Sequence, residues 1–338
     1  MGILYILAAI TFIILFFINV GWLTSNLYLT IIGEIESFVK GTNPIENIYY
    51  SSYLKWILLI DVLWLLIALF FMIQRKNFKT DAKLHYLNHK PILNPKICVV
   101  LPAYNEAKAI AEVVRNFQKN KFVKYVIVID NHSSDGTADI AEKCGSRVIR
   151  NDKNMGFGYS YALGLKESLK TDANIIVTAE ADNSFNSYDI PKTLPYLDNC
   201  DMAVGTRQNQ VLTEKGNQNS LLHVWGNFFL AKLIQIKYFS LLHTGVVNLT
   251  DVGCNFRLFR AEALKKIVNE LTYPSTDKVK AGIGVAIHLT MIGIQKDLRI
   301  IELPVTFNKR AGKSKIGSNR RIRAIKIGLI FLWLILKT

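Results

Sequence analysis

The amino-acid sequence predicts an α/β fold built on a mostly parallel sheet, and three observations lead to this prediction. Short apolar, β-branched segments alternate with amphipathic segments through the middle of the 338-residue chain. This alternation is typical of βαβ units, which bind their ligands at the carboxyl ends of the strands. Acidic and polar residues directly follow several of the apolar segments. The most hydrophobic stretches lie near the two chain ends, which separates them from this central domain.

The expected elements of the central domain follow one another without an internal repeat or a low-complexity segment. In order, they are a strand at 96–101, a helix at 107–119, a strand at 125–129, a helix at 137–144, a strand at 147–149, a helix at 158–169, a strand at 173–177 and a later strand at 299–305. Gly145 is a suitable residue to end the second helix. Parallel pairing of the strands would bring the loops that follow them to one edge of the sheet.

Two apolar segments near the N-terminus predict a transmembrane hairpin. Residues 3–23 and 53–73 are nearly uncharged, apart from Lys55 and Asp61 in the second, and each is long enough to cross a hydrocarbon core. A cleavable signal peptide is a weaker interpretation of the first segment, because no positive charge precedes it and the apolar run is too long. We therefore expect a hairpin in domain 1–74, followed by a basic linker at 75–95.

The distribution of charge predicts how this hairpin is oriented. The loop at 24–52 carries three glutamates against the single Lys40, whereas residues 74–96 carry six lysines and arginines against the single Asp81. Positive charge marks the cytoplasmic side, so we expect an integral membrane protein whose central domain is cytoplasmic. Four cysteines without metal-ligand spacing fit a reducing compartment and argue against a disulfide framework or a zinc site.

The C-terminal segment, 319–338, is basic and then apolar. Residues 308–326 contain several lysines and arginines and no acid. The apolar run at 327–336 is short for a membrane crossing. A membrane-surface helix and a transmembrane helix both remain open there. A net charge of +15 is also typical of nucleic-acid-binding proteins, which is the alternative interpretation. Because the cations flank membrane segments, where each contributes about 1 kcal/mol toward an anionic leaflet, we expect a membrane partner and no nucleic acid.

A mixed aromatic and aliphatic stretch at 225–239 is expected to form a helix. It carries Lys232 and Lys237 among its apolar residues. An ordinary core helix would fit this pattern, but we favour an interfacial helix that lies at the membrane surface.

Carboxylates follow three of the expected strands. Glu180 and Asp182 come after the strand at 173–177, while Glu106 and Asp130 follow the first two strands. A solvated strand end, a simple turn or a helix N-cap would explain each of these positions alone. Carboxylates that crowd at one sheet edge repel one another, so together they indicate a divalent cation or sugar hydroxyls as ligand. Neither GxGxxG nor GxxxxGK[ST] is present, which argues against dinucleotide and P-loop chemistry.

Several motifs resemble glycosyltransferase family 2, whose members have the GT-A fold. They are Val99-Val-Leu-Pro-Ala-Tyr-Asn-Glu106, Val128-Ile-Asp-Asn-His-Ser-Ser-Asp-Gly-Thr137, Asn154-Met-Gly-Phe-Gly158 and Glu180-Ala-Asp182. Asp251-Val-Gly-Cys-Asn-Phe-Arg257 and Phe307-Asn-Lys-Arg-Ala-Gly-Lys-Ser-Lys315 resemble the dolichyl- and polyprenyl-phosphate mannosyl- and glucosyltransferase branch. The resemblance covers about 96–318. It implies inverting, metal-dependent transfer of a sugar from a UDP- or GDP-linked donor to a polyprenyl phosphate at the cytoplasmic membrane face.

The resemblance also implies roles for individual residues. The residues that would bind the donor are Pro102, Tyr104, Glu106, Asp130, Glu180 and Asp182. Glu180 and Asp182 would hold Mg²⁺ or Mn²⁺. The acceptor phosphate would be bound by Arg207, Arg257, Arg310, Ser314 and Lys315. Arginine and lysine near Gly312 also suit a phosphate on physical grounds, since arginine supplies a planar fork and lysine a point charge. Asp182, Arg310 and Asp251 are the expected catalytic residues.

Two departures from the family pattern affect the finer prediction. The family usually opens the metal motif with Asp and has Gln where this chain has Ser184. Glu180 is one methylene longer than Asp and still ligates a metal, so we expect the metal to be retained. The donor sugar need not be mannose or glucose.

The acceptor decides which mechanism applies. A lipid phosphate is already anionic and needs no general base, whereas a lipid hydroxyl would need one, for which Asp251 is the candidate. The alternative functions are a glycolipid-forming transferase and a non-catalytic nucleotide-binding scaffold. A processive polysaccharide synthase is disfavoured, because its Gln-x-x-Arg-Trp motif is absent. The membrane hairpin could also mediate a homo-oligomer.

Overall fold

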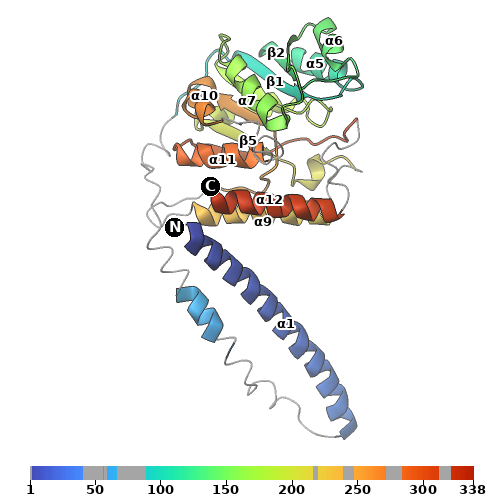
Figure 1. Cartoon of the computed structure of the whole chain (residues 1–338), viewed down its shortest axis with the longest axis vertical. Coiled ribbons are helices and arrows are strands. Elements are labelled where there is room, and N and C mark those ends of the chain that lie inside the picture. The colour runs from blue at the N-terminus through green and yellow to red at the C-terminus, as the bar shows by residue number, and fades with distance from the viewer. Residues whose placement is uncertain are drawn as a thin grey trace. The chain divides into compact units, whose positions relative to one another are not determined.

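The computed structural model describes residues 2–40, 56, 59–66, 89–215, 220–238, 247–271, 284–311 and 321–338. The chain divides into two compact units (Figure 1). The first comprises Met1–Asn77 and Lys337, and the second comprises Phe78–Leu336 and Thr338. Each unit is described by itself below.

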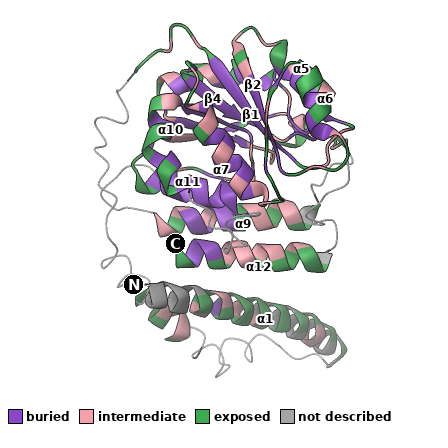
Figure 2. Ribbon diagram, turned by 45° about the horizontal axis from the view of Figure 1, so that its top comes forward, coloured by how far each residue is buried: buried purple, intermediate pink, exposed green. Residues whose placement is uncertain are grey.

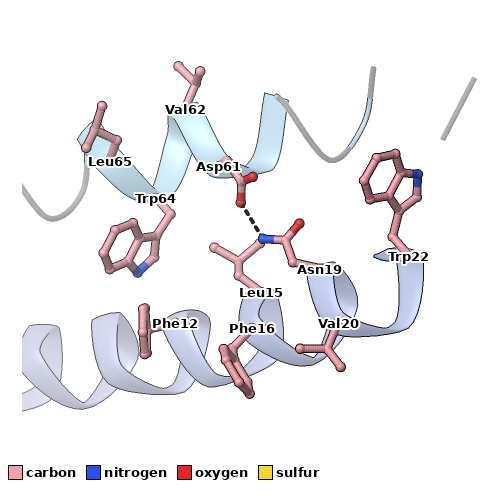
Figure 3. A pocket seen from close by; sticks show the side chains of 10 residues that line it. All are labelled: Phe12, Leu15, Phe16, Asn19, Val20, Trp22, Asp61, Val62, Trp64 and Leu65. Carbon is pink, nitrogen blue, oxygen red and sulfur yellow. Dashed lines mark hydrogen bonds between the residues drawn. The ribbon is translucent and has the colours of Figure 1, made fainter. Parts of the chain in front are cut away.

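The first unit contains the long helix α1 (Gly2–Lys40) and a shorter helical segment at 59–66. The two line an open pocket of about 750 Å³ with mostly apolar walls (Figure 3). Across it, Asn19 Nδ2 donates to Asp61 Oδ1 over 3.1 Å, and the rings of Phe12 and Trp64 lie 5.2 Å apart. This pairing gives the two helical segments one polar contact within an apolar interface.

The predicted membrane spans at 3–23 and 53–73 are not confirmed. In the described part of the chain, no helix combines the length and the hydropathy that a membrane span requires. The first predicted span falls within α1, which continues well beyond it to Lys40. Most of the second predicted span lies outside the described residues.

The second unit is built on a seven-stranded sheet of order β3-β2-β1-β4-β6-β5-β7. Its strands are β1 (Ile97–Ala103), β2 (Val123–Asp130), β3 (Arg147–Arg150), β4 (Ile175–Thr178), β5 (Met202–Thr206), β6 (Arg257–Arg260) and β7 (Ile300–Pro304). All neighbouring pairs are parallel except those of β6, which runs antiparallel to β4 and β5. The predicted α/β fold with a mostly parallel sheet is therefore confirmed.

The helices of the second unit include some on each face of this sheet (Figure 2). They are α5 (Ile110–Gln118), α6 (Thr137–Lys143), α7 (Phe157–Ser168), α8 (Asp189–Thr193), α9 (Leu221–Lys237), α10 (Ala261–Ile267), α11 (Val285–Gln295) and α12 (Arg321–Lys337), with 3₁₀ turns η1 (Leu194–Asp198), η2 (Gln210–Leu212) and η3 (Val268–Glu270). Alternate residues of β1 enter different cores: Val99 packs with α5, and Val100 packs with α7. This alternation follows from the period of two in a strand.

α9, α11 and α12 form a third buried cluster, and α9 and α12 lie side by side (Figure 1, Figure 2). The predicted helix at 225–239 corresponds to α9. Leu230, Ala231 and Ile234 of α9 are buried in the cluster, whereas Trp225 is 62% exposed. The core interpretation therefore describes one side of this helix, and the interfacial interpretation of its exposed side stays a prediction. The predicted C-terminal segment, 319–338, contains α12.

Candidate active site

The acidic pair lies at the carboxyl end of β4, where the sequence predicts it. β4 is fully buried, and the chain leaves the sheet at Thr178 just before Glu180 and Asp182. β4 and β2 both flank β1 in parallel. Asp130, the last residue of β2, and Glu106, in the loop after β1, therefore lie at the same sheet edge as the acidic pair. Asp182 is only 3% exposed, so this pair faces the interior of the site rather than bulk water.

Arg310, which follows β7, joins the two carboxylates. Its Nη2 donates to Glu180 Oε2 over 2.7 Å, and its Nε contacts Asp182 Oδ2. The backbone holds this segment in place as well, because Ala311 N donates to the Asp182 carbonyl over 3.1 Å. Burial and the charge of Asp182 raise the pKa of Glu180 above its ordinary value, although Arg310 opposes the rise. Burial lowers the pKa of Arg310, but the two carboxylates outweigh this effect and raise it.

The remaining oxygens of the acidic pair are bound by neighbouring polar groups. Asp182 Oδ1 accepts from Ser184 N over 3.1 Å and from the Ser184 hydroxyl. Glu180 Oε1 accepts from Asn255 Nδ2 over 2.9 Å. Asn255 Oδ1 is itself buried and finds no hydrogen-bond partner among the described residues. An unpaired buried oxygen is costly, so Asn255 presents an acceptor that suits a cation or a ligand donor beside Glu180.

The two loops predicted to bind the donor are bonded to each other. Asn105 N and Glu106 N donate to the hydroxyls of Ser133 and Thr137, over 2.9 and 2.8 Å. Asn105 Oδ1 accepts from the backbone of the second loop, at Ser134 N, over 2.9 Å. Asn105 has a φ of 53°, a left-handed conformation that asparagine tolerates well. These contacts fix the backbone at Asn105 and Glu106, directly after Tyr104.

Asp130 ends β2 and is 3% exposed. Its Oδ2 accepts from Ser133 N over 3.1 Å, while its Oδ1 is buried without a hydrogen-bond partner among the described residues. A carboxylate with one free oxygen in this setting suits a ligand N–H or O–H group. Pro102 is buried within β1, whereas Tyr104 at the strand end is 37% exposed and therefore accessible to a ligand.

A second charged group is formed by Arg207, which directly follows β5, and Asp251, in the loop before β6. Asp251 accepts from Arg207 Nε over 2.7 Å, Arg207 Nη2 over 2.8 Å, Arg207 N over 3.1 Å and Gly253 N over 3.0 Å. Burial alone would raise the pKa of Asp251, but Arg207 and the backbone donors outweigh it, and the pKa lies below its ordinary value. A carboxylate with both oxygens engaged and a lowered pKa is a poor general base.

The structure corrects the prediction for Arg257. Its side chain is fully buried in β6, and its guanidinium donates to Cys254 O over 3.1 Å, Thr290 Oγ1 over 2.9 Å and Ala286 O over 2.7 Å. These bonds fasten β6 to the start of α11. Arg257 is thus a core residue and does not contribute to a phosphate pocket. Ser314 and Lys315 lie outside the described residues, so their predicted roles stay predictions.

Sequence reasoning missed two residues at this site, Asn255 and Glu302. Asn255 contacts Glu180, and Glu302 of β7 accepts from the backbone at Thr250 and Asp251. Asn255 lies inside a motif whose resemblance was noted, and Glu302 interrupts an apolar strand pattern, which is a signal for a buried partner. No cluster of three or more metal-ligating residues occurs within the described ranges. A metal held by Glu180 and Asp182 would therefore need further oxygens from its ligand and from water.

Comparison with known proteins identifies similar sequences. The profile of the family described as "Glycosyl transferase family 2" matches residues 98–268. An uncharacterised protein of Methanocaldococcus jannaschii is 34% identical over 52% of this chain and 69% of its own length. The undecaprenyl-phosphate mannosyltransferase of Micrococcus luteus is 23% identical over 66% of this chain and 88% of its own. The polyprenol monophosphomannose synthase of Mycolicibacterium smegmatis is 26% identical over 68% and 84%.

A solved structure shares the fold of the second unit. Glucosyl-3-phosphoglycerate synthase from Mycobacterium tuberculosis, in complex with Mn²⁺, UDP and phosphoglyceric acid, superimposes with a TM-score of 0.50 at 18% identity. The match covers 72% of this chain and 78% of the synthase. At this identity the likeness concerns the fold alone, and it supports the α/β architecture described above.

Proposed function

This chain belongs to glycosyl transferase family 2 and is a glycosyltransferase, and we propose that it transfers a sugar from a nucleotide-sugar donor to a polyprenyl phosphate. The donor would be UDP- or GDP-linked, and the catalytic domain would have the GT-A arrangement. The observation that carries the proposal is the buried acidic pair, Glu180 and Asp182, bound to Arg310 at the end of β4. The names of the Micrococcus and Mycolicibacterium relatives, which span about two thirds of this chain, support the lipid-phosphate acceptor.

The donor end of the site suits Mg²⁺ or Mn²⁺. Glu180, Asp182 and the unpaired oxygen of Asn255 are hard oxygen ligands, which both ions prefer. When bound, the metal would neutralise the charge that develops on the leaving nucleoside diphosphate. Asp130, with its free buried oxygen, would accept a hydrogen bond from the nucleoside. Arg310 keeps the two carboxylates together and balances part of their charge.

The acceptor end suits an anion that is already charged. A phosphate monoester attacks the anomeric carbon without first losing a proton, so positioning supplies most of the catalysis, and direct displacement inverts the anomeric centre. Arg207 would bind the phosphate, since its guanidinium is charged, oriented by Asp251 and partly exposed. A lipid hydroxyl would instead need a base, and the engaged oxygens of Asp251 make it a poor one. This observation favours the phosphate over the hydroxyl acceptor.

We place the reaction at the cytoplasmic face of a membrane. The exposed apolar side chains of α9 and α12 support a membrane surface, together with the absence of acids in both helices, the lysines of both and the arginines of α12. Apolar side chains on α1, such as those of Phe16 and Phe17, are also exposed. Attachment through the N-terminal hairpin remains part of the proposal.

The test is label transfer from a panel of UDP- and GDP-sugars to polyprenyl phosphate, with purified protein and Mn²⁺ and an EDTA control. We expect an EDTA-sensitive lipid product that mild acid cleaves. Asp182→Asn should lower its formation by roughly 100-fold or more, because several kcal/mol of charge stabilisation are lost. Asp172→Asn is the matched control, since Asp172 is exposed and precedes β4 at the opposite sheet edge.

Two other outcomes would reject parts of the proposal. Slow donor hydrolysis without transfer to the lipid phosphate would exclude that acceptor and favour a lipid hydroxyl. If nucleotide binds but no donor is hydrolysed or transferred, the non-catalytic scaffold is favoured.

A further inference from the structure

We propose that Glu302 is a positioning residue that holds the Thr250–Asp251 backbone in place, so that Asp251 orients Arg207 toward the acceptor. The identity of the acceptor rests on the function proposed above. The arrangement runs from β7 through the loop before β6 to the residue that follows β5.

Glu302 makes four close contacts with this loop. Its two carboxylate oxygens accept from Thr250 N over 2.9 and 2.8 Å, from Asp251 N over 2.9 Å and from the Thr250 hydroxyl over 2.7 Å. Thr250 and Asp251 precede β6, so the sheet ladder does not bind their amides. The charge-assisted hydrogen bonds that these amides donate to the Glu302 carboxylate therefore anchor the loop to β7.

Asp251, held in this position, orients the guanidinium of Arg207. It grips the guanidinium through two parallel bonds, Nε to Oδ2 and Nη2 to Oδ1, of 2.7 and 2.8 Å. The Thr206 and Thr250 hydroxyls are 2.8 Å apart and join the same two segments a second time. The guanidinium carbon also lies 5.2 Å from the centre of the Phe307 ring. The plane of the guanidinium is therefore set by a carboxylate at its edge and by an aromatic ring.

The two members of the Asp251–Arg207 pair differ in exposure. The side chain of Asp251 is 0% exposed, whereas that of Arg207 is 16% exposed. Of this ion pair, Arg207 is thus the member that a ligand can reach. Two acids close to one arginine do not favour stability by themselves, since burial and the charge of Asp251 raise the pKa of Glu302, although the Thr250 and Asp251 donors lower it. The unfavourable placement of two acids close together is explained if the group positions the Arg207 guanidinium for a ligand.

A similar pair elsewhere in the sheet serves as a control, because no second carboxylate binds the backbone of its acid among the described residues. Asp201 and Arg299 lie at the starts of β5 and β7, where Arg299 Nη2 donates to Asp201 Oδ1 over 2.8 Å and Nε donates to Oδ2 over 3.0 Å. The fork geometry matches that of Arg207 and Asp251. Because this pair lies at the opposite end of the same strands, its loss should affect stability and leave the site intact.

The experiment is a double-mutant cycle in the full chain with polyprenyl phosphate as acceptor. Glu302→Ala should raise the acceptor KM by roughly 10-fold and leave the donor KM and donor hydrolysis unchanged. Glu302→Gln keeps an oxygen acceptor and should give a smaller change of about 2- to 3-fold. In an Arg207→Gln background, Glu302→Ala should add less than about 2-fold, since the two residues act as a unit. Asp201→Asn should lower Tm without changing the acceptor KM.

Other results would overturn the inference. Additive effects of Glu302→Ala and Arg207→Gln would mean that Glu302 does not act through Arg207. A lower Tm with an unchanged acceptor KM in both Glu302 variants would leave Glu302 a purely structural residue. If Arg207→Gln itself leaves the acceptor KM unchanged, the acceptor contact of the proposed function fails. The positioning role is then judged from the ¹⁵Nε resonance of Arg207, which Glu302→Ala should shift and Asp201→Asn should not; an unshifted resonance rejects it.

Discussion

Arg310 illustrates how one residue can satisfy an electrostatic requirement that its sequence position does not reveal. In the sequence it belongs to a basic run that suits a phosphate, yet in the structure its guanidinium lies between Glu180 and Asp182. Two buried carboxylates repel each other, and a planar arginine can contact both of them at once. Arg310 therefore holds the acidic pair together and neutralises part of its charge.

Asp201 allows a prediction on pH dependence at the residue scale. Burial would raise its pKa, but Arg299 outweighs burial, and the pKa of Asp201 lies below its ordinary value. A lowered folded-state pKa contributes stability above the unfolded-state pKa, and this contribution is lost as pH falls through the folded-state pKa. Asp201→Asn should therefore lower the free energy of unfolding by about 2 kcal/mol at pH 7, with a shrinking difference below about pH 4. Urea unfolding of both proteins at pH 7 and pH 3 measures this, and a difference independent of pH would contradict it.

At the scale of the elements, α7 packs unusually close to the sheet at Gly164. A Cβ at this position would lie 2.3 Å from Val100 Cγ1 and 3.0 Å from Ile129 Cγ1. Glycine in a helix interior costs about 1 kcal/mol relative to alanine, so its presence here reflects the space that β1 and β2 leave. The helix that follows the loop at 154–156 can thereby lie directly on the strands that end at the site.

Gly164→Ala should destabilise the protein by about 1–3 kcal/mol, because overpacking outweighs the gain in helix propensity. The matched control is Gly226→Ala in α9, where an added Cβ would meet no described atom within 4 Å. This substitution should stabilise the helix by about 0.5–1 kcal/mol. The two changes in the free energy of unfolding should have opposite signs in chemical denaturation. Stabilisation by both would show that the close approach of α7 carries no cost.

At the scale of the whole molecule, α9 and α12 present an apolar surface with positive charge beside it. Its exposed apolar residues are Leu222, Trp225, Phe228, Phe229, Ile236, Ile322, Ile325, Leu329 and Trp333. Neither helix contains an acid, and both contain lysines. Tryptophan is enriched at membrane–water interfaces, and cations are attracted to anionic headgroups. The surface therefore suits a membrane that contains anionic lipid.

A fluorophore attached at Leu329→Cys in α12 should respond to such a membrane. We expect quenching by spin-labelled lipid in anionic vesicles, weaker quenching at 1 M salt and little in neutral vesicles, because salt screens the attraction. The control is the same label at Tyr196→Cys, an exposed aromatic position in η1 that lies outside both helices. Equal quenching at both positions would argue against docking through this surface. The experiment uses the full chain.

The sequence predicted the central fold and much of the candidate site because both depend on local patterns. The strands β1, β2 and β4 and the helices α5 to α7 follow from apolar periodicity, and parallel pairing brings the loops after the strands to one edge. Glu106, Asp130, Glu180 and Asp182 could be assigned to that edge because each follows a strand that the pattern identifies. The antiparallel β6 and its neighbour β5 were not anticipated, since their short runs show no alternation with helices.

The tertiary structure decided everything that depends on burial and on partners far apart in the chain. Arg257 and Arg310 both belong to motifs that suggest a phosphate, but the structure places one in the core and the other on two carboxylates. Glu302 and Asp251 are 51 positions apart, and Asn255 and Glu180 are 75 apart. A sequence specifies the charge of a side chain and its local conformation. Its pKa, its exposure and its partners depend on which distant segments the fold brings into contact.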